Sequence, residues 1–181
     1  MIQIVWQSEE RNVKSKLSEL TIFEFEFIAE QFNKPGPNLP KWMAVAEYFT
    51  GFPEEEILEW PQSLFQKLVD NMFAAGDLGE PLPFIEFNGE ILTASITLTM
   101  RAISKIEKIF AAAEPDSVSR SLAVVFGSEL AEEQEALLVA HIKTMPTVGL
   151  IPHFKYTVKD YFDYLTQSNP IKLDEPNVET V

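Results

Sequence analysis

The sequence predicts a predominantly helical α+β fold, organised as a tandem of two modules that each consist of a β-hairpin followed by helices. One observation is that the same pattern, strand-type alternation followed by helical periodicity, occurs in both halves. A second is a constant offset of 78 residues between similar positions, by which Leu20, Thr21, Ile28 and Phe32 recur as Leu98, Thr99, Ile106 and Phe110.

Composition places the module boundaries. Residues 76–83 contain two glycines and two prolines without periodicity, which is typical of a linker. We therefore predict a first module over residues 1–75, a second over 84–167, and a C-terminal tail over 168–181 whose prolines oppose a helix. If the duplication is real, residues 13–68 and 91–154 should superpose, with a helix over 131–145 as an insertion.

Both modules are expected to open with a hairpin. In the first, an apolar run at residues 2–6 is followed by a polar stretch and by alternation at 13–17. In the second, Asn88-Gly89 separates two strand-like runs, 84–87 and 90–93. Asn-Gly is a strong hairpin signal because both residues tolerate the positive φ angles of a type I′ turn.

Helical signals follow each hairpin. Thr21 and Glu24 have the spacing of a capping box, and Gly51 is suited to end a helix in the left-handed conformation. Pro53 and the three glutamates after it are typical of a helix start, where negative charge meets the positive end of the dipole. The predicted helices cover residues 21–33, 39–50, 54–60, 63–75, 98–113, 118–126, 131–145 and 157–165.

Composition and charge limit the class of protein. The 181 residues, 46% of them hydrophobic, can bury one sizeable core or two small ones. The absence of cysteine excludes disulfides and cysteine-ligated zinc, and it fits a reducing compartment. No secretory pattern or run of 18 apolar residues occurs, so we expect a soluble, cytoplasmic protein and no membrane partner.

The formal net charge is −14, with 14 acids against 6 bases in residues 1–80 and 14 against 8 in residues 81–181. Such a surface repels nucleic-acid phosphates, because their binding depends on clustered lysine and arginine. Direct nucleic-acid binding is therefore not expected. Acidic residues placed for solubility are the simplest interpretation, and an acidic face that mimics DNA is an alternative.

The sequence contains no constellation that predicts a reaction. His141 and His153 are twelve residues apart and lack the spacing of a helical metal pair. No nucleophile elbow and no glycine-rich phosphate loop occur. We therefore predict no catalytic residue, no metal site and no cofactor, and a protein that is not an enzyme.

Aromatic residues are more informative. Fourteen Phe, four Tyr and three Trp include runs such as FEFEF, in which neighbouring rings cannot all face one core. The excess predicts an exposed aromatic contact surface, because aromatic side chains supply much of the binding energy at interfaces. The candidates are Phe23, Phe27, Trp42, Phe52 and Tyr161, and the acids expected around them are Glu24, Glu26 and Glu30.

One stretch also resembles a known family. Ser18-Glu19-Leu20-Thr21-Ile22, Tyr48-Phe49-Thr50-Gly51 and the segment 54–61, EEEILEWP, are similar to the N-terminal region of tail assembly chaperones of tailed bacteriophages. The resemblance covers residues 13–68, about a third of the chain. It implies a small, mainly helical protein that binds a tape-measure or tail-tube protein. The chain departs from that pattern in its second copy and its C-terminal extension.

The sequence therefore predicts a phage-type assembly chaperone that binds a tail protein, with self-association as a further expectation. A structural virion protein, such as a head–tail connector or a tail component, is the alternative. An acidic inhibitor that mimics DNA is the third.

Overall fold

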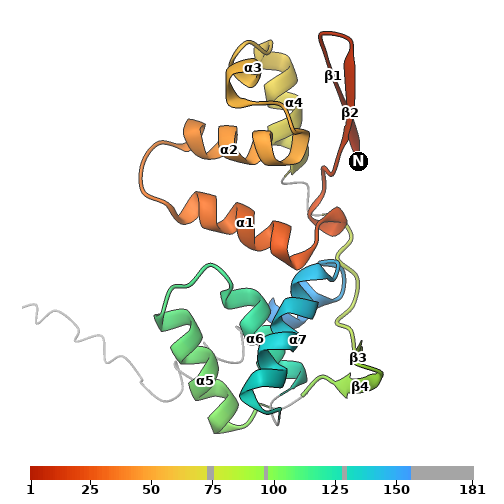
Figure 1. The fold of residues 1–181 in the computed structure, drawn as a ribbon, viewed down its shortest axis with the longest axis vertical. Helices are drawn as coiled ribbons and strands as arrows, with labels where there is room; N and C mark the ends of the chain where they lie inside the picture. Colours follow the sequence, from red (N-terminus) through yellow and green to blue (C-terminus); the bar gives the residue numbers. More distant parts are fainter. Residues whose placement is uncertain (73–75, 96–97, 128–129, 156–181) are drawn as a thin grey trace, which may run out of the picture.

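The computed structural model describes residues 1–72, 76–95, 98–127 and 130–155. They form a predominantly helical α+β structure with two two-stranded antiparallel sheets, as predicted. The elements lie in two lobes stacked along the long axis (Figure 1). We refer to residues 1–72 as the N-terminal lobe and to residues 76–155 as the C-terminal lobe.

The first hairpin pairs β1 (Ile2–Trp6) with β2 (Glu9–Val13), so the prediction of a second strand at 13–17 is wrong. Gln7 and Ser8 form the turn with φ angles of 46° and 72°. The polar residues 9–12 can pair as a strand because they face solvent, whereas Ile4 and Val13 are buried. Residues 17–19 form a 3₁₀ turn.

The second hairpin is confirmed. β3 (Phe84–Phe87) pairs with β4 (Glu90–Thr93), and the Asn88-Gly89 turn has φ angles of 52° and 80°. The alternation of β3 puts Ile85 and Phe87 into the core of the C-terminal lobe.

The helices begin and end within a few residues of their predicted bounds. The end of the predicted helix 63–75, all of the predicted helix 157–165 and the tail 168–181 lie outside the described residues. A further helix, which the sequence did not predict, begins at Leu150 and runs to 155, the last residue that the structure describes. The other helices are α1 (Ile22–Asn33), α2 (Asn38–Thr50), α3 (Glu54–Leu58), α4 (Gln62–Met72), α5 (Met100–Ala111), α6 (Ser117–Phe126) and α7 (Glu132–Thr144).

Threonine caps begin α1 and α5. Thr21 Oγ1 accepts the Glu24 N–H and the Glu24 carboxylate accepts the Thr21 N–H, so the capping box is present. Thr99 caps α5 in the same way through the Ala102 N–H, without a reciprocal carboxylate. These two threonines are equivalent in the proposed repeat. The order of hairpin, helix and helix also agrees, while the duplication itself stays a prediction.

In the described part of the chain, three apolar clusters fill the lobes, one in the N-terminal lobe and two in the C-terminal lobe, and α1 contributes to the largest cluster of each lobe. Ile28 packs in the N-terminal cluster with Val45, whereas Ile22 packs in the C-terminal cluster with Leu122 and Leu138. Opposite faces of α1 are therefore covered by different lobes. This helix lies between the rest of the N-terminal lobe and the C-terminal lobe (Figure 1).

Residues 145–149 join the lobes through backbone hydrogen bonds. The Ile22 N–H donates to the Met145 carbonyl and the Thr147 N–H donates to the Leu20 carbonyl, both at 2.9 Å. The Gly149 N–H donates to the Leu78 carbonyl at 2.7 Å. The segment predicted to be a linker is thus packed along residues 147–149, on the border between the lobes.

Candidate interaction surface

Three aromatic side chains form a partly exposed group on α1 and α2, which we call the aromatic patch: Phe23, Phe27 and Tyr48. Phe23 and Tyr48 are 48% and 44% exposed. Phe27 stacks on Tyr48 with ring centroids 4.4 Å apart and planes at 30°. Phe23 lies one turn before Phe27 on α1, so the two side chains share a side of the helix.

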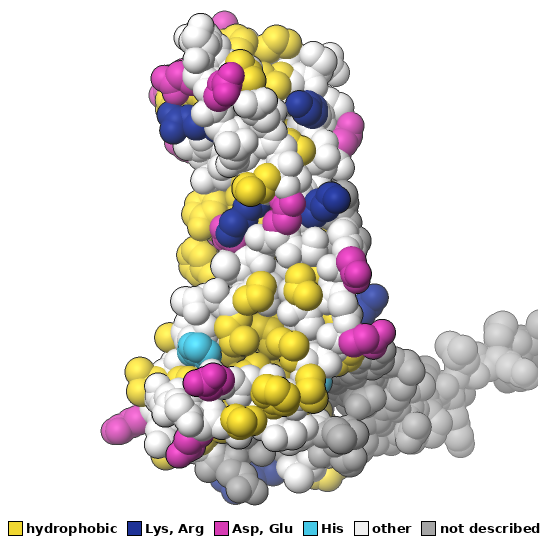
Figure 2. Space-filling view, turned by 90° about the vertical axis from the view of Figure 1, so that its right-hand side faces the viewer, with side chains coloured by type: hydrophobic (Ala, Val, Ile, Leu, Met, Phe, Trp, Pro, Cys, Tyr) yellow, Lys and Arg dark blue, Asp and Glu magenta, His cyan; other side chains and the backbone are white. Residues whose placement is uncertain are grey.

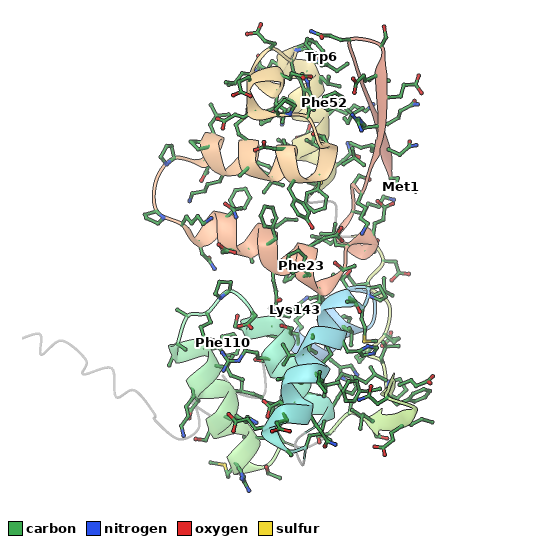
Figure 3. All side chains as sticks on the ribbon, in the orientation of Figure 1. Met1, Trp6, Phe23, Phe52, Phe110 and Lys143 are labelled. Carbon is green, nitrogen blue, oxygen red and sulfur yellow. The ribbon has the colours of Figure 1, made fainter. Side chains whose placement is uncertain are left out.

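Figure 3 labels Phe23 on α1, at the level where the two lobes meet. Its position follows from the geometry of the helix. Ile22 and Phe25 are turned toward the C-terminal cluster and Ile28 toward the N-terminal cluster. At 100° per residue Phe23 falls between these directions, and it remains open to solvent.

An ion pair borders the aromatic patch. Lys14 Nζ lies 2.7 Å from a carboxylate oxygen of Glu24, which is also the capping-box residue of α1. Partial burial raises the pKa of the Tyr48 hydroxyl, and the negative charge of Glu24 adds to this, while Lys14 opposes it. Tyr48 therefore keeps its proton at neutral pH and can donate a hydrogen bond to a ligand.

The other aromatic candidates lie apart from this patch. Phe52 is only 2% exposed and packs edge-on against Trp60, so its prediction as an exposed contact is wrong. It follows the Gly51 turn that ends α2, which directs its ring into the lobe. Trp42 is half-buried against Phe32, with centroids 4.9 Å apart. Tyr161 lies outside the described residues.

Glu26 was predicted to be one of the acids around the aromatic contact surface, and this prediction is wrong. It is 4% exposed and faces the C-terminal lobe. The Ser119 N–H donates to Glu26 Oε1 at 2.6 Å, and Ser119 Oγ donates to Oε2 at 3.2 Å. Ser119 lies in the first turn of α6, where a carboxylate satisfies a free N–H group and meets the positive end of the helix dipole.

Burial raises the pKa of Glu26, and the two hydrogen bonds from Ser119 oppose that rise. Lys143 on α7 also lowers the pKa, while Asp116 before α6 raises it. The sequence signal for this burial is the second apolar stripe of α1, because Ile22, Phe25 and Ala29 flank Glu26 on one helix face.

The C-terminal lobe carries a second apolar surface, which was not predicted from the sequence. Phe84 and Ile91 are 53% and 69% exposed and lie on the solvent face of the second hairpin, and Val148 after α7 is 37% exposed. Figure 2 shows hydrophobic side chains gathered over the lower part of the face that it presents.

The two histidines and the glutamates of α3, which are side chains of types that can serve in catalysis or metal binding, do not form one site. His141 packs on Phe87 and His153 on Phe126, with ring centroids 5.6 and 5.3 Å apart. Glu54, Glu55 and Glu56 are exposed on the first turn of α3. Over the described residues, no group of three or more histidine or acidic side chains is arranged to hold a metal ion.

No family model, curated protein or solved structure matches this chain. None of the helices within the described ranges is both long enough and apolar enough to cross a membrane.

Proposed function

We propose that this chain is a non-enzymatic, phage-type assembly protein that binds a tail protein, either the tape-measure or the tail-tube protein, during morphogenesis. The aromatic patch is the observation that carries the proposal. It lies within the stretch that resembles tail assembly chaperones, since Phe23, Phe27 and Tyr48 all fall between residues 13 and 68.

The composition of the patch suits a protein partner. Large rings that are half exposed gain apolar burial when a partner covers them, and a central aromatic anchor contributes about 2 kcal/mol or more. The Tyr48 hydroxyl and the Lys14–Glu24 pair at its border can fix the orientation of the partner.

The test is co-expression of the full chain with the tape-measure or tail-tube protein of the same phage, followed by size-exclusion chromatography and calorimetry. We expect a complex that Phe23→Ala weakens by about 30-fold, which corresponds to about 2 kcal/mol. Phe84→Ala, an equally exposed phenylalanine on the other lobe, is the matched control and should leave the affinity unchanged. Equal binding by wild type and Phe23→Ala would exclude the patch as the contact.

A structural virion protein is the second candidate, and the exposed apolar face at Phe84 and Ile91 favours it. A connector contacts two neighbours and needs two surfaces, which the two lobes provide. Quantitative mass spectrometry of purified virions separates the candidates. A chaperone is absent from the finished particle, whereas a connector is present in a fixed copy number.

A further inference from the structure

Helix α5 carries a row of cations on one side. Arg101, Lys105 and Lys108 are spaced by four and three residues, so they share one face of the helix, and all three are exposed. This face lines a groove of about 740 Å³. Ala102 and Val124, both buried, line the groove below the cations.

The cations of this groove are incompletely neutralised. The described residues that line it are Thr99, Arg101, Ala102, Ser104, Lys105, Lys108, Val124 and Leu130, and none of these carries a carboxylate. Lys105 pairs with Glu135 on α7. Arg101 and Lys108 pair with no acidic side chain in the part of the chain that the structure describes. In a protein of net charge −14, this is a local surface of the opposite sign.

The groove continues into a neighbouring region that has both signs of charge. That region, of about 630 Å³, shares Arg101 and Lys105 with the groove. It adds Arg120 of α6 and three carboxylates, which are those of Asp116 before α6 and of Glu132 and Glu135 on α7. Arg120 there is paired with Glu114 and lies 3.8 Å from Asp116. The excess of positive charge is therefore confined to the α5 side.

We propose that this α5 groove binds an acidic, extended segment of a partner protein, with carboxylates on the cations and one apolar side chain over Ala102 and Val124. Arg101 and Lys108 are seven residues apart, about 10 Å along the helix. Alternate residues of an extended peptide are about 7 Å apart and point the same way, so two or three carboxylates can follow the row.

The same geometry disfavours other anions. A small phosphate prefers converging backbone N–H groups, and the Ala102 N–H at the start of α5 is already bonded to Thr99 Oγ1. Single-stranded nucleic acid is held by aromatic stacking as well as by cations, and among the residues that the structure describes no aromatic side chain lines this groove.

The groove is on the C-terminal lobe and the aromatic patch is on the N-terminal lobe, so this proposal is independent of the proposed function. The probe is a fluorescein-labelled peptide of sequence EELEELEELEEL, titrated with the full chain at low salt and followed by fluorescence anisotropy. We expect saturable binding that weakens with added salt. Arg101→Glu combined with Lys108→Glu should weaken it about tenfold or more.

The matched control is Lys16→Glu combined with Lys67→Glu, which changes the net charge equally at exposed bases of the other lobe and should reduce the affinity about twofold at most. Circular dichroism verifies that both double variants are folded. A QQLQQLQQLQQL peptide that binds as tightly as the acidic one would overturn the proposal. So would an oligothymidine that binds while the acidic peptide does not, an unchanged affinity of the α5 variant, or no binding of the peptide at all.

Discussion

The FEFEF run on α1 shows how neighbouring residues acquire different roles. Both sides of this helix are covered, one by each lobe, so a step of 100° per residue changes the surroundings completely. Phe25 packs in the C-terminal cluster, Phe27 stacks on Tyr48, and Phe23 stays exposed. Most aromatic side chains of this run are therefore used to pack α1 against the two lobes, and only a small aromatic patch stays exposed.

The exposures of two phenylalanines predict losses of stability of very different size. Phe52→Ala removes a ring that is 2% exposed, and we expect the free energy of unfolding to fall by about 3–5 kcal/mol. Phe23→Ala removes a ring that is 48% exposed and should cost about 0.5 kcal/mol or less. Urea unfolding followed by circular dichroism measures both. Equal losses in the two variants would contradict the burial described for these side chains.

Glu26 predicts a pH dependence of stability. Its folded pKa lies above the value of 4.5 that it has in the unfolded chain, so the folded state holds this proton more tightly. Its contribution to stability is complete below pH 4.5 and is lost as the pH rises through the folded pKa. Glu26→Gln removes this titration while its amide oxygen can still accept the Ser119 N–H.

Urea unfolding of wild type and Glu26→Gln at a series of pH values measures the effect. The stability of wild type minus that of the variant should fall as the pH rises from about 4.5. Other titrations cancel in this difference, including that of Glu19, whose pKa is lowered to about 2, chiefly by a hydrogen bond from the N-terminal ammonium. A difference that is constant or rises with pH would show that Glu26 is not stabilised in its protonated form.

At the scale of elements, local signals predicted the structure well. The Thr21 capping box, the Asn88-Gly89 turn and the Gly51 terminus depend on residues within four positions of each other, so the sequence contains all their determinants. The second strand of the first hairpin was misplaced because its polar residues, exposed on both faces except for Val13, lack the apolar alternation used to find strands.

The capping box of α1 gives the prediction at this scale. Thr21→Ala removes the acceptor of the Glu24 N–H at the start of the helix that both lobes cover. We expect a loss of about 1 kcal/mol in the free energy of unfolding. Thr21→Ser keeps the hydroxyl and should recover most of that loss. If serine were no better than alanine, packing of the threonine methyl group, and not the cap, would explain the effect.

At the scale of the molecule, the contacts between segments far apart in the chain were the part of the structure that the sequence did not predict. Residues 76–83 have a linker composition, yet the Leu78 and Leu82 backbones bond to Gly149. Glu26 is bound to Ser119, 93 residues away. Such partners are determined by which helix faces are covered after folding, and the local pattern of one segment does not contain that information. The sequence also predicted two separate modules, whereas α1 contributes to the largest apolar cluster of each lobe.

The shared helix predicts that the lobes unfold together. The three tryptophans, Trp6, Trp42 and Trp60, all lie in the N-terminal lobe, so their fluorescence reports that lobe alone. Leu138 is fully buried in the C-terminal cluster, and Leu138→Ala should destabilise that cluster by about 2–5 kcal/mol. Since Ile22 of α1 packs in the same cluster, the loss of stability should extend to the N-terminal lobe and be seen in the tryptophan fluorescence as well.

Urea unfolding of wild type and Leu138→Ala, followed by tryptophan fluorescence and by circular dichroism, tests this coupling. We expect one transition, with the same midpoint by both probes, that shifts to lower urea in the variant. Val45→Ala, in the N-terminal cluster, is the reciprocal variant and should shift both probes likewise. An unchanged fluorescence midpoint in Leu138→Ala, with a separate second transition by circular dichroism, would mean that the lobes are independent domains and that α1 and residues 145–149 transmit too little stability to couple them.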